Sequence, residues 1–349
     1  MPNSWKLTFQ IAFTYIGTVV GAGFASGREI IEFFVQYGVQ GFVGILLASF
    51  LFIWSGIQVM LVARHIKATS YHDISMYLFG KPLGTFFNII LLTILIGTTS
   101  VMLAATGSIF VESFQLSPQL GIWLSMICIY IVTVRGLHAI HSVNSFFVPI
   151  LIGFTILVFL HHQPWVQTGS NSGVIIETAR SWVWITSPLS YVALNIALSQ
   201  SVLVPMGRES KDRRTLIWGG ILGGCGIGLL LLLAYSSMHN HSPQILEVEM
   251  PMIFLLTDMG KAAAYLFALL VFAEIFSSLV ANVFGVVEQM KRFFSITPSI
   301  ITIFILLLSY LISFIGFSSL LSVLYPLFGQ VVVIFLLMLG YRQWERKRK

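Results

Sequence analysis

The chain has 349 residues, of which 57% are hydrophobic and only 9% are charged. A soluble domain carries about 25% charged residues and leaves a large surface in contact with water. The composition therefore argues against a soluble enzyme, a nucleic-acid-binding protein or a disordered scaffold. It predicts an all-helical protein that crosses a membrane many times, with the lipid bilayer and a small-molecule substrate as partners and no nucleic acid. The oligomeric state stays open.

Apolar runs long enough to span a bilayer, about 20 residues each, occur ten times along the chain. They lie near 8–35, 40–63, 83–112, 119–135, 143–160, 181–205, 214–237, 260–289, 297–315 and 319–341. The glycines of the seventh run are best explained as a face for close helix packing. The first run also resembles a signal peptide, with small residues at Ala25-Ser26 as its cleavage site; cleavage would remove one span.

The basic residues orient these spans, because Lys and Arg concentrate in cytoplasmic loops. With the N-terminus inside, 16 of the 19 Lys and Arg fall on the cytoplasmic side. We therefore expect a multi-pass protein of the cell membrane with both termini in the cytoplasm. The 16 are Lys6, Arg64, Lys67, Lys81, Arg135, Arg208, Lys211, Arg213, Arg214, Lys291, Arg292, Arg342, Arg346, Lys347, Arg348 and Lys349.

The ten spans fall into two sets of five with similar spacing, since the second set follows the first by 168 to 179 residues. An odd number of spans per set forces the second copy to enter from the other side of the membrane. A five-plus-five inverted repeat is the geometry of many secondary transporters. We therefore expect one membrane domain built from repeats 1–170 and 171–349, joined by the outer loop 161–180.

Glycines interrupt the first span at bilayer depth. Gly21 and Gly23 each weaken a helix by about 1 kcal/mol relative to Ala. A break there frees carbonyls for a cation and starts a half-helix whose N–H groups favour an anion. The predicted substrate-binding stretch is Gly21, Ala22, Gly23, Phe24, Ala25 and Ser26. The alternative is an unbroken helix, in which GxxxG spacing serves close packing.

The corresponding span of the second repeat contains Pro188, which removes a backbone donor and favours a kink or break. Hydroxyl and amide groups surround it, and we predict that they line the opposite wall of the substrate site: Ser187, Ser190, Tyr191 and Asn195. A merely kinked packing helix is the alternative. Paired interruptions at equivalent places favour a binding site at the centre of the membrane.

Polar groups recur in the eighth span, where Glu274, Ser277 and Ser278 lie within about one helical turn. An ionisable residue in mid-span indicates function, and two hydroxyls with main-chain carbonyls suit a hard monovalent cation. The alternative is that both serines bond to their own helix. Arg28 and Glu29 follow the first break toward the outer face, where they form either an external gate or a solvated pair.

The stretch Gly17–Ile30 resembles the opening helix of the YkvI-type membrane proteins, which look like a branch of the amino acid–polyamine–organocation superfamily with the LeuT fold. The likeness extends to 247–252 and to 274–285. It implies that spans 1, 2, 6 and 7 move as a bundle against spans 3, 4, 8 and 9. In sodium-coupled members of that fold, the ion position corresponds here to carbonyls of Gly17, Val20 and Glu274 and hydroxyls of Ser277 and Ser278.

We therefore predict an ion-coupled symporter of amino acids or similar zwitterions, with no cofactor besides the coupling ion. No catalytic signature such as HExxH, Walker A or GxSxG is present. The span 143–160 contains no Lys, the residue that replaces the ion in some proton-coupled relatives, so sodium is favoured. Glu274 keeps proton coupling open. A permease-like receptor without transport is the main alternative, and interrupted helices disfavour a passive channel.

Overall fold

The computed structural model describes residues 2–135, 140–162, 182–210, 212–239, 244–291 and 297–348, which are almost entirely helical and contain no strand. The first span is divided into three helices, α1 (Pro2–Val19), α2 (Ala22–Ser26) and α3 (Arg28–Phe33), followed by the short 3-10 helix η1 (Val35–Tyr37). The glycine-rich stretch thus interrupts the helix twice, once before α2 and once after it.

A helix occupies each of the ten predicted spans. The remaining helices are α4 (Val39–Ile66), α5 (Tyr71–Phe114), α6 (Pro118–Arg135), α7 (Ile140–His161), α8 (Val183–Glu209), α9 (Arg213–His239), α10 (Gln244–Glu247), α11 (Pro251–Thr257), α12 (Lys261–Met290), α13 (Pro298–Ser313) and α14 (Phe317–Arg348). Among the described residues, six helices are long and apolar enough to cross a membrane, and three shorter ones are apolar. The number of crossings therefore stays a prediction.

Helix α5 begins at Tyr71, 12 residues before the apolar run near 83–112. Its first part starts with a capping box formed by Ser70 and Asp73. Gly80 then adopts non-helical angles, φ 77° and ψ 177°, two residues before Pro82. The hydropathy pattern recognised only the membrane-spanning part beyond this kink.

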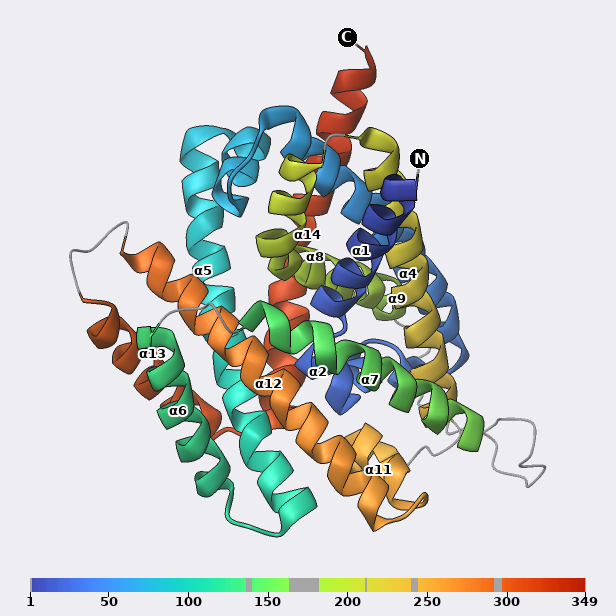
Figure 1. Cartoon of the computed structure of the whole chain (residues 1–349), viewed down its shortest axis with the longest axis vertical. Coiled ribbons are helices and arrows are strands. Elements are labelled where there is room, and N and C mark those ends of the chain that lie inside the picture. Colours follow the sequence, from blue (N-terminus) through green and yellow to red (C-terminus); the bar gives the residue numbers. More distant parts are fainter. Residues whose placement is uncertain are drawn as a thin grey trace.

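The helices pack in two groups. In Figure 1, α1, α4 and α9 lie on the right, and α5, α6 and α13 lie on the left. Helices α1, α4, α8 and α9 contact one another, and α5, α6, α12 and α13 form the other group. These are spans 1, 2, 6 and 7 and spans 3, 4, 8 and 9, the two sets that the family resemblance implies. Helix α14 joins the groups by packing on both α8 and α5.

Glycines of α9 allow the first group to pack closely, as the sequence predicts. A Cβ on Gly219 or Gly223 would meet α1, while one on Gly220 or Gly224 would meet α4, each within 2.7 Å of the nearest atom. Small residues let helix backbones approach where lipid supplies no hydrophobic driving force. The glycines therefore let α9 pack closely against both α1 and α4, and van der Waals contact stabilises this packing.

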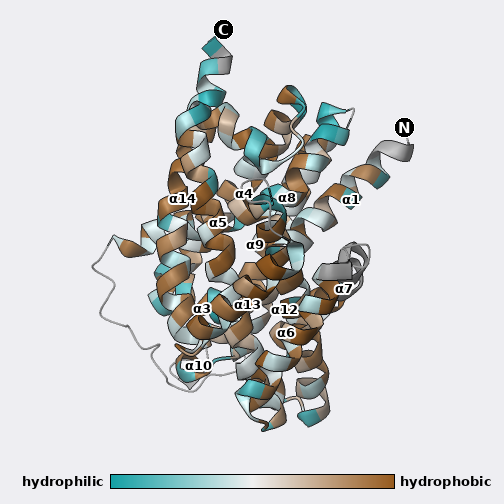
Figure 2. Cartoon of the chain, turned by 90° about the vertical axis from the view of Figure 1, so that its left-hand side faces the viewer, coloured by the Kyte–Doolittle hydropathy of each residue, from teal (hydrophilic) through white to brown (hydrophobic). Residues whose placement is uncertain are grey.

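Both chain ends lie at the same end of the molecule (Figure 1). Hydrophobic residues dominate the middle of the helices, and hydrophilic residues gather near the C-terminal end and around α10 (Figure 2). This arrangement is typical of a protein embedded in a bilayer. The predicted boundary between the two repeats, in the loop 161–180, falls almost wholly outside the described residues.

The predicted interruption of the sixth span is wrong, because α8 runs as one helix from Val183 to Glu209 with Pro188 inside it. The proline lies in the second turn, so it removes one backbone hydrogen bond near the helix start rather than at mid-span. Its ring also packs on α4, where a Cβ on Gly44 would lie 2.9 Å from the Pro188 Cγ. Pro188 therefore serves packing without ending the helix.

Candidate functional site

The candidate site is built around α2, a five-residue helix between two glycine breaks. Gly21 is extended, with φ −101° and ψ −156°, and Gly27 has a left-handed conformation, with φ 84°. Glycine adopts a positive φ without the steric cost that other residues meet. The Ser26 hydroxyl donates to the Gly23 carbonyl over 2.8 Å and accepts from the Arg28 N–H over 3.2 Å. All of α2 is buried.

Helix α12 packs on one side of α2. A Cβ on Gly21 would lie 3.7 Å from the Ser278 hydroxyl oxygen, so the serine faces the break. Glu274 is 1% exposed, and its Oε1 has no hydrogen-bond partner. Ser277 is also buried. The structure therefore places Ser278 at the first break, with Glu274 and Ser277 buried within one turn of it on α12.

The other two proposed cation ligands lie before the first break, Gly17 in the last turn of α1 and Val20 just after α1 ends. Val20 is fully buried, and its N–H donates to the Ile16 carbonyl over 2.7 Å. The side of Gly17 that would carry a Cβ faces Val148 of α7, at 3.1 Å, and not α12. Gly21, at the break, thus lies beside the Ser278 hydroxyl of α12, whereas Gly17 packs against α7.

Glu29 does not lie at the outer face, where the sequence places it together with Arg28. Its side chain is 5% exposed, and a Cβ on Gly23 would come within 1.5 Å of the Glu29 Oε1. The carboxyl therefore occupies the space directly over Gly23 on α2. The left-handed turn at Gly27 starts a new helix, which turns Glu29 inward and lets Arg28 point outward.

Tyr191 of α8 faces the Glu29 carboxyl. The tyrosine is fully buried, and the Glu29 carboxyl lies within hydrogen-bonding reach of its hydroxyl. Its ring packs against Phe33 and Phe34, each with ring centroids 5.1 Å away, and against Phe52 at 5.9 Å. Three aromatic contacts fix the orientation of the ring, so the hydroxyl is held toward the carboxyl.

The other residues predicted to form the opposite wall serve packing: Ser187 and Ser190 contact neighbouring helices, and Asn195 bonds within α8. Ser187 donates to the Phe33 carbonyl over 2.8 Å, and Asn195 donates to the Tyr191 carbonyl over 3.0 Å. The Ser190 backbone lies against α14, where a Cβ on Gly329 would come within 2.4 Å of its carbonyl. Only Tyr191 of this set turns a polar group toward the side chains of the broken first span.

The start of α3 is tied to α10 and to the segment that follows it. Arg28 Nη1 donates to the carbonyls of Leu246 and Val248 over 2.7 and 3.1 Å. On the α5 side, the Glu112 carboxylate accepts from the N–H groups of Glu249 and Met250 over 2.9 and 3.1 Å. One segment therefore links α3 of the first group to α5 of the second.

The sequence reasoning missed three residues of this arrangement. It assigned no role to Glu112 or Glu249, although their position at span ends next to a Pro-initiated helix is typical of a capping role. Tyr325 of α14 is 4% exposed and lies within electrostatic reach of Glu29. An isolated tyrosine before Pro326 carries no signal that would have assigned it to the site.

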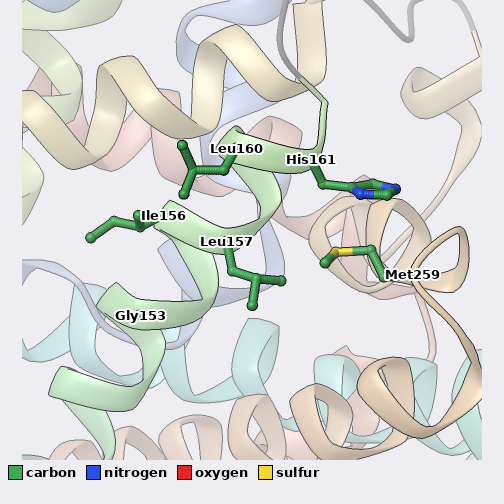
Figure 3. Close-up of a pocket in the computed structure, with 6 residues that line it drawn as sticks. All are labelled: Gly153, Ile156, Leu157, Leu160, His161 and Met259. Atoms are coloured by element: carbon green, nitrogen blue, oxygen red, sulfur yellow. The ribbon is translucent and has the colours of Figure 1, made fainter.

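A hollow elsewhere on the surface, between α7 and the turn after α11, has a different character (Figure 3). It is lined by Gly153, Ile156, Leu157, Leu160, His161 and Met259. Leu160 is 57% exposed and Ile156 is 42% exposed. Such an apolar outer face fits contact with lipid tails rather than with a polar solute.

The fold is that of solved membrane transporters with the LeuT fold. The chain is similar to MhsT, solved in complex with L-phenylalanine, with a TM-score of 0.64 and 17% identity over 93% of this chain and 88% of that one. It is also similar to a Na+-coupled sialic acid symporter, with a TM-score of 0.60 and 15% identity over 95% and 77% of the two chains. For Mhp1, a nucleobase-cation-symport-1 family transporter, the TM-score is 0.56 at 14% identity over 87% and 70%.

Similarity to a full-length relative shows the family of this chain. No protein-family model matches the chain. It is 34% identical to the uncharacterized membrane protein YkvI of Bacillus subtilis (strain 168) over 100% of this chain and 99% of that protein. It is also 24% identical to the uncharacterized protein YyaD of the same organism, over 94% of each chain. The chain belongs to the YkvI family of membrane proteins, as the motifs of the first and eighth spans indicate.

Proposed function

We propose that this protein is an ion-coupled symporter of amino acids or similar small zwitterions that works by alternating access. The observation that carries the proposal is the break between α1 and α2, which faces Ser278 of α12, one turn from the buried Glu274. Unwound backbone inside a membrane is stable only where it is buried in protein or lines a cavity. At such breaks, transporters bind their substrates and coupling ions.

The neighbours in fold support transport but not one substrate class, since their titles name an amino acid, a sialic acid and a nucleobase-cation symporter family. We favour a zwitterion because the site combines backbone N–H groups at the start of α2 with the buried carboxyl of Glu274 on α12. Backbone N–H groups attract a carboxylate, and carboxyl oxygens attract an ammonium group. In this proposal the chain makes ten crossings of the cell membrane, with both termini in the cytoplasm.

Sodium is the proposed ion at α12. The ligands would be the hydroxyls of Ser277 and Ser278 and carbonyls of Glu274, Gly17 and Val20, an all-oxygen set that suits a hard cation. The Ser278 hydroxyl already lies beside Gly21. Two neutral hydroxyls add no formal charge, which is consistent with weak, reversible binding of a monovalent ion.

The test is uptake into proteoliposomes that contain only this protein. Replacing both serines, Ser277→Ala with Ser278→Ala, should abolish stimulation of uptake by sodium. The matched control is Ser236→Ala with Ser237→Ala in α9, an adjacent helical pair whose hydroxyls donate to carbonyls of their own helix. Unchanged sodium stimulation in the α12 variant would contradict the assignment. Ligand binding without any flux would favour the receptor alternative.

A further inference from the structure

Glu29 forms a second polar site on α2, apart from the α12 residues. The Glu29 carboxyl lies over Gly23, whereas Ser278 of α12 faces Gly21. Glu29 belongs to α3 and Ser278 to α12, so the two polar groups reach this stretch from different helices. A cation at the α12 residues would therefore not account for the buried carboxyl of Glu29.

The groups around Glu29 leave its carboxyl without a cation. From α8 the Tyr191 hydroxyl faces it, and Tyr325 of α14 lies within electrostatic reach of it. From α9, Tyr235 is engaged elsewhere, since it donates to the Gly38 carbonyl over 2.6 Å. Among the described residues, the ion pairs lie at Lys291–Glu288 and at Arg342–Glu345, and neither involves Glu29.

Charged neighbours in sequence also turn away from Glu29. Arg28 donates to carbonyls of the segment before α11, and its closest charges are Glu32, Glu112 and Glu249. Glu32 pairs with the Gln36 amide. Tyr37 of η1 faces Glu32 and Ser187. The charged groups of α3 and η1 thus form a network at the outer end that does not include the Glu29 carboxyl.

An ionised carboxylate buried without a counter-ion is strongly unfavourable. The space around this carboxyl is filled by the α2 backbone and by a tyrosine ring packed on three phenylalanines. A proton neutralises the group without needing room, whereas a metal ion or an organic ammonium needs a cavity. We propose that Glu29 is a proton-binding residue of the transport cycle, protonated while α2 and α3 pack as in this structure and ionised when they move.

The two glycine breaks make such movement local. The α2–α3 segment starts at the extended Gly21 and contains the left-handed Gly27, and interruptions of this kind act as hinges. The chemical step is reversible: an O–H bond forms at the Glu29 carboxyl with a proton from water on one side and breaks to water on the other. This inference deepens the proposed symport and rests on it, with a proton at Glu29 alongside the cation at α12.

The first test needs no substrate. Infrared spectra of the purified protein at neutral pH should contain the carbonyl stretch of protonated, buried carboxylic acid, and Glu29→Gln should remove one component of it. Glu32→Gln, three residues along the same helix, is the matched control and should leave the band unchanged. Gly23→Ala, which displaces the carboxyl, should shift the same component. A full, unshifted band in both Glu29→Gln and Gly23→Ala would overturn the proposal.

The second test separates proton coupling from transport itself. Proteoliposomes are given a mixture of the twenty standard amino acids, and exchange at equal pH is compared with net uptake driven by a pH gradient. Glu29→Gln should retain exchange and lose stimulation by the pH gradient. If the variant keeps that stimulation, the role of Glu29 is overturned while symport stands. If the wild type exchanges no amino acid, the proposed function fails and the coupling role falls with it.

Discussion

The first and sixth spans occupy equivalent places in the two halves of the chain, yet only the first is divided. Glycines set its two breaks, with Gly21 extended and Gly27 at φ 84°. In α8 the helix continues through Pro188, which lies near its start and packs against Gly44. Backbone freedom at glycine thus divides this span, whereas a proline in the second turn of a helix does not. The chemistry of the site is accordingly concentrated on one side, at α2.

The largest effect is expected from Gly23→Ala, which would drive a methyl group into the Glu29 carboxyl. Overpacking of a filled site costs about 1–3 kcal/mol, so thermal unfolding of the purified protein should occur at a clearly lower temperature. Adding Glu29→Ala should restore much of the loss because it removes the clashing group.

The matched control is Gly21→Ala, two residues earlier, where the new Cβ makes only an ordinary 3.7 Å contact with Ser278. It should lower the melting temperature less than Gly23→Ala does. Equal losses for the two variants, or no rescue by Glu29→Ala, would contradict the placement of the Glu29 carboxyl over Gly23.

A smaller effect is expected from Pro188→Ala. The substitution removes the ring from Gly44 but restores a backbone donor, so the free energy of unfolding should change by no more than about 1 kcal/mol. Amino acid uptake should be retained, because α8 does not depend on a break at this residue. A loss of uptake in a stably folded variant would show that α8 opens at Pro188 during transport. The first and sixth spans would then both be interrupted at some stage of the cycle.

The smallest effect is expected at Asp212, between α8 and α9 and away from both spans' centres. Hydrogen bonds from the Arg214 N–H and the Thr215 hydroxyl hold the pKa of this carboxyl below its usual range. A lowered pKa in the folded state stabilises it above the unfolded value of about 3.9 and loses that stabilisation as the pH falls through the folded value. Asp212→Ala should therefore lower Tm slightly at pH 7, and the difference should vanish in acid.

Local sequence features predict much of this architecture. Runs of apolar residues define the helices, and Gly21 with Gly23 marks the break, because both signals depend on composition within one segment. The burial of Glu29 could not be predicted, because it depends on the positive φ of Gly27. That turn directs the Glu29 side chain inward and the neighbouring Arg28 side chain away from it. The continuity of α8 depends on where the helix starts relative to Pro188, and Tyr325 joins the site only through the packing of α14 on α8.

Net accumulation of an amino acid in proteoliposomes, with and without an inward sodium gradient, tests the central claim most directly. The claim is that the broken first span and α12 together form an ion-coupled transport site. It predicts that the wild-type protein concentrates at least one of the twenty standard amino acids above the external level when the gradient is present. Binding without flux, or flux that only equalises the two sides, would contradict it.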